Sequence, residues 1–401
     1  MSLALNQIAA LPPLQASAPC AVCKLCGAPC DLFDVVDFLK HCGHGQQYRF
    51  GTAGIAVPYF RCHACGFLFA TVFDDWPAEA MARHVYNADY VQVDPDYAGS
   101  RASAFASRLA PVFHRFKQAR VLDYGSGSGV FAQHLRQAGF ADVCAYDPFS
   151  HPQRPQQTFD LITCFEVIEH SLNPRETFAD MRGLLAPGGV IVLSQTVQPV
   201  NIEEVRGAWW YLAPRNGHVS LYTAAALQRL SGGGTWRHLE RWLWAWTDGV
   251  PGEGARFCSA FGTRVAALRL TAPVHDQAHG WHALECEGEG KFRWMAAPLH
   301  TWHVAPMPPG PVTLHLEIPY VLEVHPGFAA GCRLGVNGQQ IRCFAGHSAL
   351  RGETDIEGGS APIEITLVTP PLHAPNTLGR NGDSRALGLA VVADGSVSGF
   401  G

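Results

Sequence analysis

A glycine-rich segment between two expected regular elements carries the clearest chemical signal in the sequence. Residues 121–129 read VLDYGSGSG, an apolar strand that includes Asp123 and then enters three alternating glycines before a helix. Glycines let the backbone adopt positive φ and approach a ligand, and the following helix offers unpaired N–H groups to a carboxylate or phosphate. The next strand ends at Asp147, 18 residues beyond Gly129. An acid there can accept both ribose hydroxyls of an adenosine ligand.

Two other nucleotide ligands fit this segment less well. A dinucleotide-binding turn has the pattern Gly-x-Gly-x-x-Gly, whereas the position expected for its third glycine holds Val130. A triphosphate-binding loop needs a lysine before Ser or Thr, and no lysine occurs between Lys117 and Lys291. The spacing therefore weakens the dinucleotide interpretation and excludes a triphosphate loop of this kind.

Four segments in order resemble the motifs of the class I S-adenosylmethionine-dependent methyltransferases. They are the glycine turn, Asp147 at the second strand, residues 159–170 (FDLITCFEVIEH) at the fourth strand and residues 184–190 (LLAPGGV) before the fifth. The resemblance implies a Rossmann-like, doubly wound α/β sheet and S-adenosylmethionine as cofactor. It also implies a set of cofactor-binding residues: Asp123, Gly125 and Gly127 at the methionine end, Asp147 at the ribose, Phe165 and Glu166 beside the cofactor, and Tyr90 in a lid. For Tyr90, packing of an interdomain helix is an equal alternative.

Two histidines are candidates for work on the methyl acceptor. Methyl transfer needs mainly alignment and a dry pocket, but an alcohol acceptor must also lose its proton to a nearby base. His170 ends the run that starts at Glu166, and His218 lies in an insertion after the fifth strand. That insertion resembles a Pro-x-x-Gly-His stretch, followed by Tyr or Phe, of several sugar and small-molecule methyltransferases; here the last position is Tyr222. We predict that His218 is the general base or orients the acceptor, with His170 and Tyr222 as further catalytic candidates. The alternatives are a loop-ordering role for His170 and a structural role for His218.

Two Cys-x-x-Cys-Gly segments predict a metal site. Cys23 and Cys26 form one pair, Cys62 and Cys65 the other, and each tight turn presents two thiolates to a tetrahedral ion. Four thiolates close the site to water, so we expect a structural Zn²⁺ rather than a catalytic one. A redox dithiol is the competing interpretation, and Cys20, Cys30 or a nearby histidine could replace one ligand.

The fusion of such a zinc knuckle to this core resembles the deoxysugar C-methyltransferases over roughly residues 20–270. The resemblance implies a sugar or glycan-related acceptor, methylated at a hydroxyl or ring carbon, in polysaccharide or nucleotide-sugar metabolism. The carboxy-terminal region departs from that family, which leaves the acceptor atom open. Two alternatives are an O-methyltransferase of a quinone or other small-molecule hydroxyl, with an apolar pocket around Trp209, Trp210 and Tyr211, and a non-catalytic glycan-binding protein.

Changes in composition and hydrophobic pattern along the chain predict four parts. We expect a flexible leader over 1–19, a zinc-knuckle domain over 20–75, a methyltransferase domain with a helical lid over 76–272 and an all-β sandwich over 273–401. In the third part, helical spacing predicts a helix over 101–117, and strands alternate with helices from residue 120 onward. Asn337-Gly338 predicts a two-residue hairpin turn. The sandwich tryptophans Trp281, Trp294 and Trp302 are expected to fill its core, with stacking on sugar rings as the alternative.

Composition sets the outer limits. With 401 residues, 47% of them hydrophobic, the chain can bury cores for two or three domains. The formal charge of −5, without any basic block, argues against nucleic acid as a partner. We expect no membrane span and no secretory signal, and scattered single cysteines are typical of reduced thiols, so a cytoplasmic location is predicted.

Overall fold

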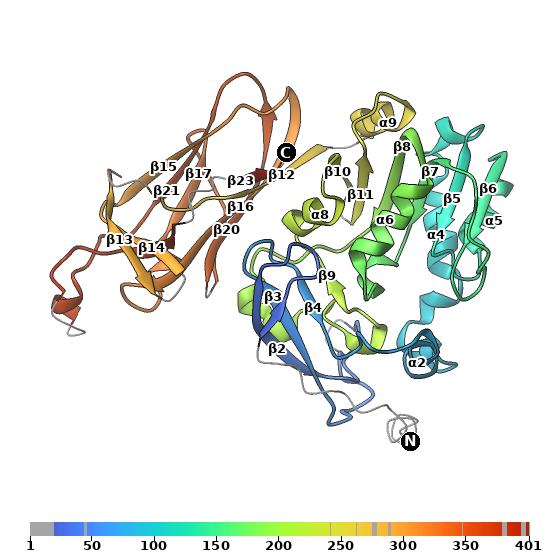
Figure 1. Ribbon diagram of the computed structural model, residues 1–401, viewed down its shortest axis with the longest axis horizontal. Helices are drawn as coiled ribbons and strands as arrows, with labels where there is room; N and C mark the ends of the chain where they lie inside the picture. The colour runs from blue at the N-terminus through green and yellow to red at the C-terminus, as the bar shows by residue number, and fades with distance from the viewer. Residues whose placement is uncertain are drawn as a thin grey trace. The chain divides into compact units, whose positions relative to one another are not determined.

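The computed structural model describes residues 20–43, 46–240, 242–261, 263–274, 279–287, 290–346, 348–378, 383–393 and 398–400. The leader expected over 1–19 lies outside the described residues. The chain forms two compact units, Met1–Gln198 with Arg206–Gly262, and Pro199–Val205 with Thr263–Gly401 (Figure 1). The second unit thus begins ten residues before the boundary expected at 273 and includes a short segment that follows the catalytic strands.

The cysteine-rich region folds as a five-stranded antiparallel sheet. Its strands, in spatial order, are β1 (Cys20–Val22), β2 (Pro29–Asp37), β3 (Ala56–Cys62), β4 (Leu68–Ala70) and β9 (Ser220–Leu221). Aromatic residues of β3, β4 and the turn between them are fully buried, among them Phe60, Phe67 and Phe69. The last strand, β9, comes from the insertion that carries His218, and it pairs with β4. The cysteine-rich sheet and the expected acceptor region are therefore joined by backbone hydrogen bonds.

The sheet expected for the catalytic domain has the order β6-β5-β7-β8-β11-β10. Its strands are β5 (Arg120–Tyr124), β6 (Asp142–Tyr146), β7 (Phe159–Cys164), β8 (Leu185–Ser194), β10 (Thr235–Glu240) and β11 (Leu243–Thr247). The first four run parallel, and β11 and β10 form an antiparallel hairpin at one side. Strands β7 and β8 are rich in Ile, Val and Leu and buried on both faces, as parallel strands covered by helices are. The predicted wound α/β fold is confirmed.

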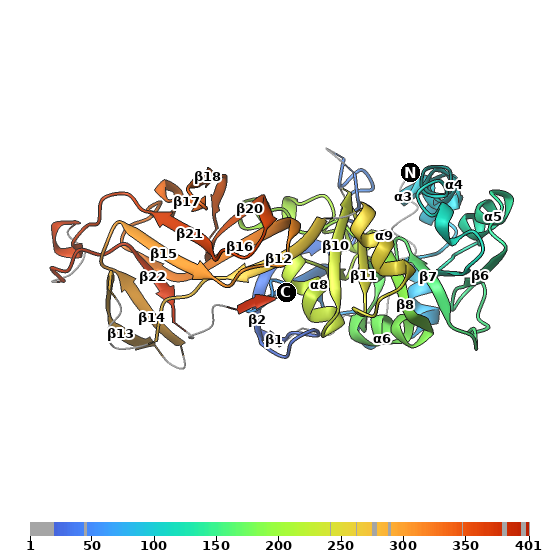
Figure 2. The ribbon, with the colours of Figure 1, turned by 90° about the horizontal axis from the view of Figure 1, so that it is seen from above.

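Helices cover both faces of this sheet (Figure 2). On one face, α4 (Ser100–Leu109), α5 (Val130–Gln137) and α9 (Glu253–Phe261) share a hydrophobic core with the strands. On the other face, α6 (Pro174–Leu184) packs with α8 (Ala224–Ser231). The remaining helical elements of this unit are α2 (Ala78–His84), α3 (Tyr90–Val93), η1 (Pro95–Ala98), η2 (His114–Phe116), η3 (Ile168–His170), η4 (Arg206–Ala208) and η5 (Pro214–Asn216).

The helix expected over 101–117 is too long. The α-helix α4 ends at Leu109, with Ala110 as its C-cap, and a separate 3₁₀ turn follows at His114–Phe116. Pro111 explains the break, because proline has no N–H to continue the helix and restricts the residue before it. The apolar spacing persisted across the break because Phe113 and Phe116 enter the same core as Leu109.

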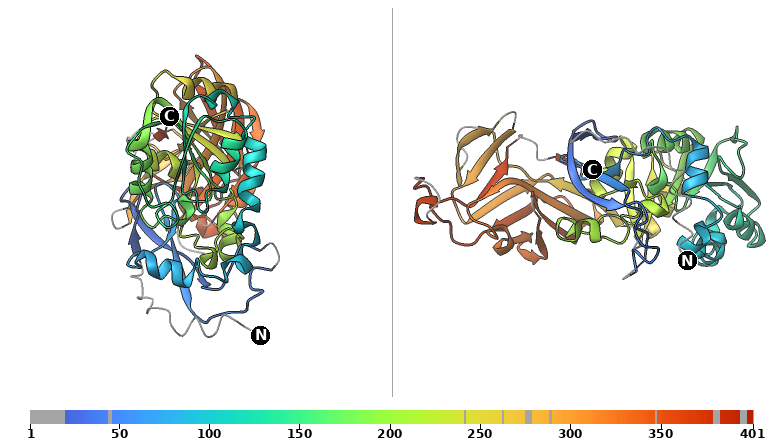
Figure 3. Two further views of the ribbon diagram at one scale, coloured as in Figure 1. Left: turned by 90° about the vertical axis from the view of Figure 1, so that its right-hand side faces the viewer. Right: turned by 90° about the horizontal axis from the view of Figure 1, so that it is seen from below.

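The second unit is built mainly from strands, coloured orange to red in Figure 3. One group consists of hydrogen-bonded strands: β12 (Thr263–Arg269), β13 (Trp281–Glu287), β14 (Gly290–Met295), β16 (Gly310–Glu323), β19 (Cys343–Ala345), β20 (Ala349–Gly358), β22 (Leu389–Val392) and β23 (Ser398–Phe400). A separate sheet comprises β15 (Leu299–Val304), β21 (Ile363–Val368), β17 (Arg333–Val336) and β18 (Gln339–Ile341). The unit also contains α7 (Ile202–Val205), η6 (Ala329–Gly331) and η7 (Pro375–Leu378).

Both strand groups of this unit contribute to one hydrophobic core. Trp294 and Trp302 are 9% and 7% exposed within it, which confirms the expectation that they fill the core. Trp281 is only partly buried and packs against this core from its side. The hairpin expected at Asn337-Gly338 is also confirmed, because both residues have positive φ (49° and 78°) between β17 and β18.

Candidate active site

The glycine turn after β5 has the backbone that its sequence predicts. Gly125, Gly127 and Gly129 all have positive φ, between 51° and 77°. A Cβ atom at Gly125 would lie 2.4 Å from Cγ2 of Val167, whereas one at Gly127 would meet nothing within 4 Å. The first glycine is thus required for close packing against the end of β7, and the second leaves open space beside the turn.

Asp147 holds this turn against the end of the neighbouring strand. It follows β6 directly, is 8% exposed, and its Oδ2 accepts a 3.1 Å hydrogen bond from the N–H of Gly127. Its Oδ1 accepts from the N–H groups of Phe149 and Ser150, at 2.9 and 2.8 Å. The carboxylate therefore stays at the sheet edge, beside the turn, where the ribose contact was predicted.

Two polar atoms at the turn have unused hydrogen-bonding capacity. Asp123 is 3% exposed; its Oδ1 accepts from Thr163 at 3.3 Å, but Oδ2 has no hydrogen-bond partner among the described residues. Burial raises the pKa of Asp123 to about 7. The hydroxyl of Ser126 is likewise buried and unpaired within the described chain. An acidic acceptor, a free hydroxyl and an open glycine turn together fit the charged amino-acid end and the ribose of S-adenosylmethionine.

Phe165 and Glu166 follow β7. Phe165 packs edge-on against Phe105 and Phe131, with ring centroids 5.5 and 5.1 Å apart. Glu166 has a φ of 57°, in the left-handed region, and its N–H donates to Oγ of Ser194 at 2.7 Å. Ser194 in turn donates to Oε1 of Glu166 at 2.9 Å. Strained backbone of this kind is common where a side chain must be held for function.

Opposite charges surround the Glu166 carboxylate. Burial, and then the nearby Glu169 carboxylate, raise the pKa of Glu166 to about 7, while the guanidinium of Arg101 opposes this rise. Arg101 Nη1 lies 3.6 Å from Oε2 of Glu166 and also donates to Asp94 at 2.9 Å. The loop after β7 therefore has two carboxylates balanced only in part by one cation.

Glu169 and His170 lie in the 3₁₀ turn η3. Glu169 is fully buried, and its Oε1 accepts a 2.6 Å hydrogen bond from the hydroxyl of Tyr211. Its Oε2 has no hydrogen-bond partner among the described residues. The Nδ1 atom of His170 lies 3.1 Å from the carbonyl of Gly217, and its ring centroid is 5.0 Å from that of His218. The structure thus brings together His170 and His218, which are 48 positions apart in the chain.

His218 is held in the same cluster. It is 4% exposed, its Nδ1 lies 2.8 Å from the carbonyl of Tyr211, and Cys42 Sγ lies 3.5 Å from the same nitrogen. Burial lowers the pKa of both His170 and His218, so each ring is neutral at pH 7. A neutral ring that donates from Nδ1 keeps Nε2 as an acceptor. Both histidines therefore present an unprotonated Nε2, which can accept a hydrogen bond from a hydroxyl group.

The structure places the remaining candidates outside direct contact with these ring nitrogens, as far as the described residues go. The Tyr222 hydroxyl donates to the carbonyl of Ile168 at 3.1 Å, and its fully buried ring packs against Phe67. The Tyr90 hydroxyl donates to the carbonyl of Asn216 at 3.1 Å, and its ring, 3% exposed, packs against neighbouring tyrosines. Both contacts order the loops that carry His170 and His218.

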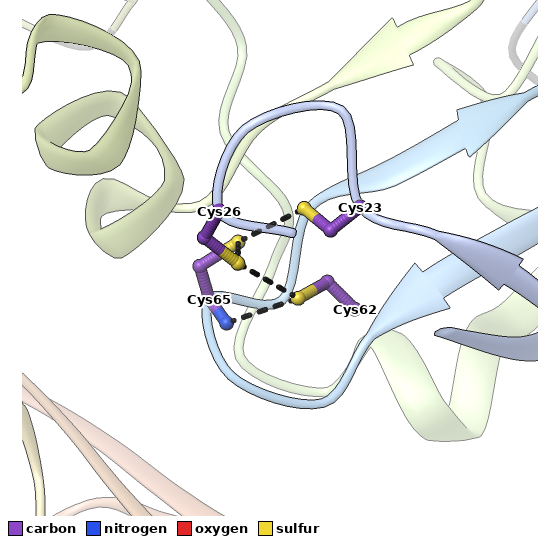
Figure 4. Close-up of side chains that lie close together, drawn as sticks. All are labelled: Cys23, Cys26, Cys62 and Cys65. Atoms are coloured by element: carbon purple, nitrogen blue, oxygen red, sulfur yellow. Dashed lines mark hydrogen bonds between the residues drawn. The ribbon is translucent and has the colours of Figure 1, made fainter. Parts of the chain in front are cut away.

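Four cysteine sulfurs converge between the two knuckles (Figure 4). Cys23 Sγ lies 3.7 Å from Cys65 Sγ, and Cys26 Sγ lies 3.5 Å from Cys62 Sγ and 3.8 Å from Cys65 Sγ. Four thiolates at about 2.3 Å from a tetrahedral zinc would lie roughly 3.8 Å apart, so the donor set fits that ion. Hydrogen bonds from Cys23 and its neighbours hold the pKa of Cys62 well below its usual range.

Neighbouring candidate ligands are not part of this set of four. His63 points to Asp31 instead, with Nε2 and Oδ2 3.1 Å apart. Cys30 is buried nearby, and hydrogen bonds with Cys23 and Cys62 raise its pKa, which favours a protonated thiol. The predicted ligands Cys23, Cys26, Cys62 and Cys65 are therefore the four that the fold brings together.

Comparison with known proteins addresses the class of enzyme. Residues 76–231 match the model of a family described as a methyltransferase domain. The glycine turn and Asp147 lie within the matched segment, so this part of the chain is similar to a methyltransferase domain.

Several solved structures are similar to a part of the chain. An O-methyltransferase family protein from Burkholderia thailandensis is 14% identical with a TM-score of 0.27, over 39% of this chain and 62% of that one. Magnesium protoporphyrin IX methyltransferase from Synechocystis PCC 6803 is 14% identical with a TM-score of 0.27, over 37% and 82%. An N-methyltransferase from Bradyrhizobium japonicum WM9 is 16% identical with a TM-score of 0.27, over 43% and 97%. The chain thus spans less than two thirds of the first of them.

No curated protein matched this chain. Within the described residues, no helix combines the length and the apolar character needed to cross a membrane.

Several polar partners in the site were not expected from the sequence. Glu169 was visible in the run that ends at His170 but had no assigned role, and Tyr211 was considered only as part of an apolar pocket. Arg101 and Cys42 reach the site from distant segments. Arg101 and Cys42 are far from the site residues in the sequence, so no local pattern identifies them. Only Glu169, which is adjacent to His170, could have been assigned to the site from the sequence.

Proposed function

We propose that this enzyme transfers a methyl group from S-adenosylmethionine to a hydroxyl or ring carbon of a sugar or glycan-related acceptor. The observation that carries the proposal is the pair of neutral histidines, half-buried His170 and buried His218, each fixed through Nδ1 and each with Nε2 uncommitted among the described residues. Glu166 and Glu169 lie on the same loop. Such a polar cluster at the carboxyl ends of parallel strands suits a polyhydroxylated acceptor.

The cofactor supplies an electrophilic methyl group when bound. The glycine turn and Asp147 would hold its ribose, and the uncommitted oxygens at Asp123 and Ser126 would bind its amino-acid end. On the acceptor side, His218 would take the proton of the attacking hydroxyl or orient that hydroxyl, with His170 beside it. Both imidazole rings are held in place by backbone carbonyls at Nδ1, so the two Nε2 atoms would have fixed positions beside the acceptor.

The quinone alternative finds less support in the residues expected to line its pocket. Trp209 and Tyr211 are 6% and 4% exposed, so they are part of the packing rather than free walls. The Tyr211 hydroxyl donates to Glu169 and its carbonyl contacts His218. The immediate surroundings of the insertion are therefore polar, which favours hydroxyl-rich acceptors over apolar rings.

The test uses purified protein, labelled S-adenosylmethionine and a panel of nucleotide sugars, glycans and quinols. We expect transfer to a sugar-containing acceptor, and we expect His218→Ala to abolish most turnover while binding of S-adenosylhomocysteine, measured by calorimetry, is retained. The surface variant His114→Ala serves as control, since His114 is exposed and bonds only its own turn. Transfer to quinols alone, or unchanged turnover of His218→Ala, would overturn this assignment.

We assign a structural Zn²⁺ to the four cysteines as part of the same proposal. All four positions of a tetrahedral ion would be filled by Cys23, Cys26, Cys62 and Cys65, which leaves none for water or substrate. Elemental analysis should give one zinc per chain that is absent from a Cys62→Ser, Cys65→Ser double variant. A full complement of zinc in that variant would contradict the assignment.

A further inference from the structure

Three side chains of the active site have possible metal-ligand atoms close together. Glu169, His170 and His218 each offer one ligand atom, and these three atoms lie within 4.8 Å of one another. Glu169 is 0% exposed, and its Oε2 has no hydrogen-bond partner within the described chain. A buried carboxylate oxygen without a partner is costly, because it has lost its water and gained nothing in exchange. A bound cation would compensate for this loss.

The opposite end of each side chain is fixed by a hydrogen bond. His170 Nδ1 is held at the Gly217 carbonyl (3.1 Å) and His218 Nδ1 at the Tyr211 carbonyl (2.8 Å). The Tyr211 hydroxyl holds Glu169 through Oε1 at 2.6 Å. Metal-binding histidines are typically oriented in this way, by donating the second ring N–H to a carbonyl while the free nitrogen faces the ion. One loop, Tyr211 to His218, supplies all three anchoring groups.

We propose that Glu169, His170 and His218 bind a divalent transition-metal ion through Oε2 and the two Nε2 atoms. Two imidazoles and one carboxylate suit Zn²⁺, Mn²⁺, Fe²⁺ or Co²⁺, and three protein ligands leave positions open for other donors. This inference rests on the proposed function, since the open positions would take an oxygen of the acceptor. With Nε2 on the ion, His218 would orient the acceptor hydroxyl through the ion and would not itself take its proton. It narrows the substrate class to acceptors with a hydroxyl, or two adjacent oxygens, able to bind a cation.

The geometry requires only a small adjustment of the side chains. Ligand atoms at about 2.1 Å from one ion lie no more than roughly 4.2 Å apart, compared with the present limit of 4.8 Å. The cysteine site cannot substitute for this one, because its four donors are sulfur and its coordination is complete. The two sites therefore differ in donor type, and a spectroscopic probe distinguishes them.

The experiment titrates Co²⁺ into full-length protein whose cysteine site already contains zinc. We expect one further equivalent to bind, with the visible d–d absorption of nitrogen and oxygen ligation and without the thiolate charge-transfer bands of a sulfur site. Glu169→Gln, His170→Ala and His218→Ala should each weaken binding by on the order of 100-fold or more. His114→Ala, an exposed histidine, should bind Co²⁺ like the wild type.

Tyr211→Phe guards against variants that fail to fold, because it keeps all three ligands and removes only the hydroxyl that orients Glu169. We expect it to weaken Co²⁺ binding by about tenfold. Absence of a second equivalent in the wild type, thiolate bands on its binding, or unchanged affinity in all four variants would each overturn the proposal.

The outcome for methyl transfer is read separately. Full turnover of a sugar acceptor by protein stripped of this ion would overturn the metal's role and leave the proposed function intact. Binding of Co²⁺ without transfer to any acceptor in the panel would have the reverse meaning, since the site would exist and the proposed acceptor class would fail.

Discussion

Two glycines of the cofactor turn, Gly125 and Gly127, differ in the contacts that an added methyl group would make. At Gly125 the new Cβ would lie 2.4 Å from Val167 Cγ2, while at Gly127 it would meet no atom within 4 Å. Both residues have positive φ (72° and 51°), so alanine at either position costs about 1–2 kcal/mol through backbone strain. Gly232, at the end of α8, has the same kind of φ (64°) and equally open surroundings, so Gly232→Ala measures the strain alone.

The expected losses of stability follow from that comparison. Gly127→Ala and Gly232→Ala should each lower the free energy of unfolding by about 1–2 kcal/mol. Gly125→Ala should lower it by roughly 2–5 kcal/mol, because overpacking against Val167 adds about 1–3 kcal/mol to the strain. Urea unfolding followed by tryptophan fluorescence measures all three variants under one set of conditions.

The affinity for S-adenosylhomocysteine should separate Gly127→Ala from Gly232→Ala, although the two variants are expected to lose the same stability. The methyl group of Gly127→Ala would occupy the open space beside the turn, so we expect at least tenfold weaker binding, about 1.4 kcal/mol, while Gly232→Ala binds like the wild type. Calorimetry at a temperature where all variants are folded gives these affinities. Unchanged affinity of Gly127→Ala would refute the placement of the cofactor at this turn, and equal stability of Gly125→Ala and Gly232→Ala would refute the packing argument.

Further predictions concern charge, metal and the insertion. Burial raises the pKa of Asp123 to about 7 in the folded protein, above its unfolded value, so the apoprotein should lose stability as pH rises from about 4 to 7 and little more above that; urea unfolding across this range should show a flatter profile for Asp123→Asn, and an unchanged slope would contradict the assignment. Removal of zinc by a chelator, or Cys62→Ser, should unfold the amino-terminal sheet with loss of β-signal in circular dichroism, and a spectrum unaffected by zinc loss would argue against a structural ion. Lys40 is fully buried and its Nζ donates to the carbonyls of Trp209 and Leu212 at 2.9 and 2.5 Å, so Lys40→Met should cost about 1–3 kcal/mol and lower turnover; wild-type stability of this variant in urea would show that the carbonyls find other partners.

Local signals predicted the catalytic sheet closely. The strand expected before the glycines is β5 (Arg120–Tyr124), and the helix expected after them is α5. These elements are legible because each is specified by a few adjacent residues: an apolar run, a glycine turn, then helical spacing. The error at α4 came from reading apolar spacing through Pro111, where core packing continues although the helix does not.

The acceptor side could be predicted only in part, because its contacts are long-range. His170 and His218 were recognisable from their motifs, but the hydrogen bond between Tyr211 and Glu169 joins residues 42 positions apart, and the contact between Cys42 and His218 spans 176. The pairing of β9 with β4 is equally invisible, since two residues, Ser220 and Leu221, carry no strand pattern of their own. Such features depend on how elements are assembled, which spacing within one segment does not encode.

The short strand β9 connects the cysteine-rich sheet to His218, which the proposed function places at the acceptor. It begins two residues after His218, whose carbonyl accepts a 2.7 Å hydrogen bond from Tyr59 in β3, and it ends beside Thr223, whose hydroxyl donates to the carbonyl of Cys65 at 2.6 Å. The segment with His218 is thus held by β3 at one end and by the second cysteine knuckle at the other. A truncated chain that starts after residue 75 would keep the glycine turn but lose the contacts that support His218. Binding of the methyl donor and transfer of its methyl group would then become separable.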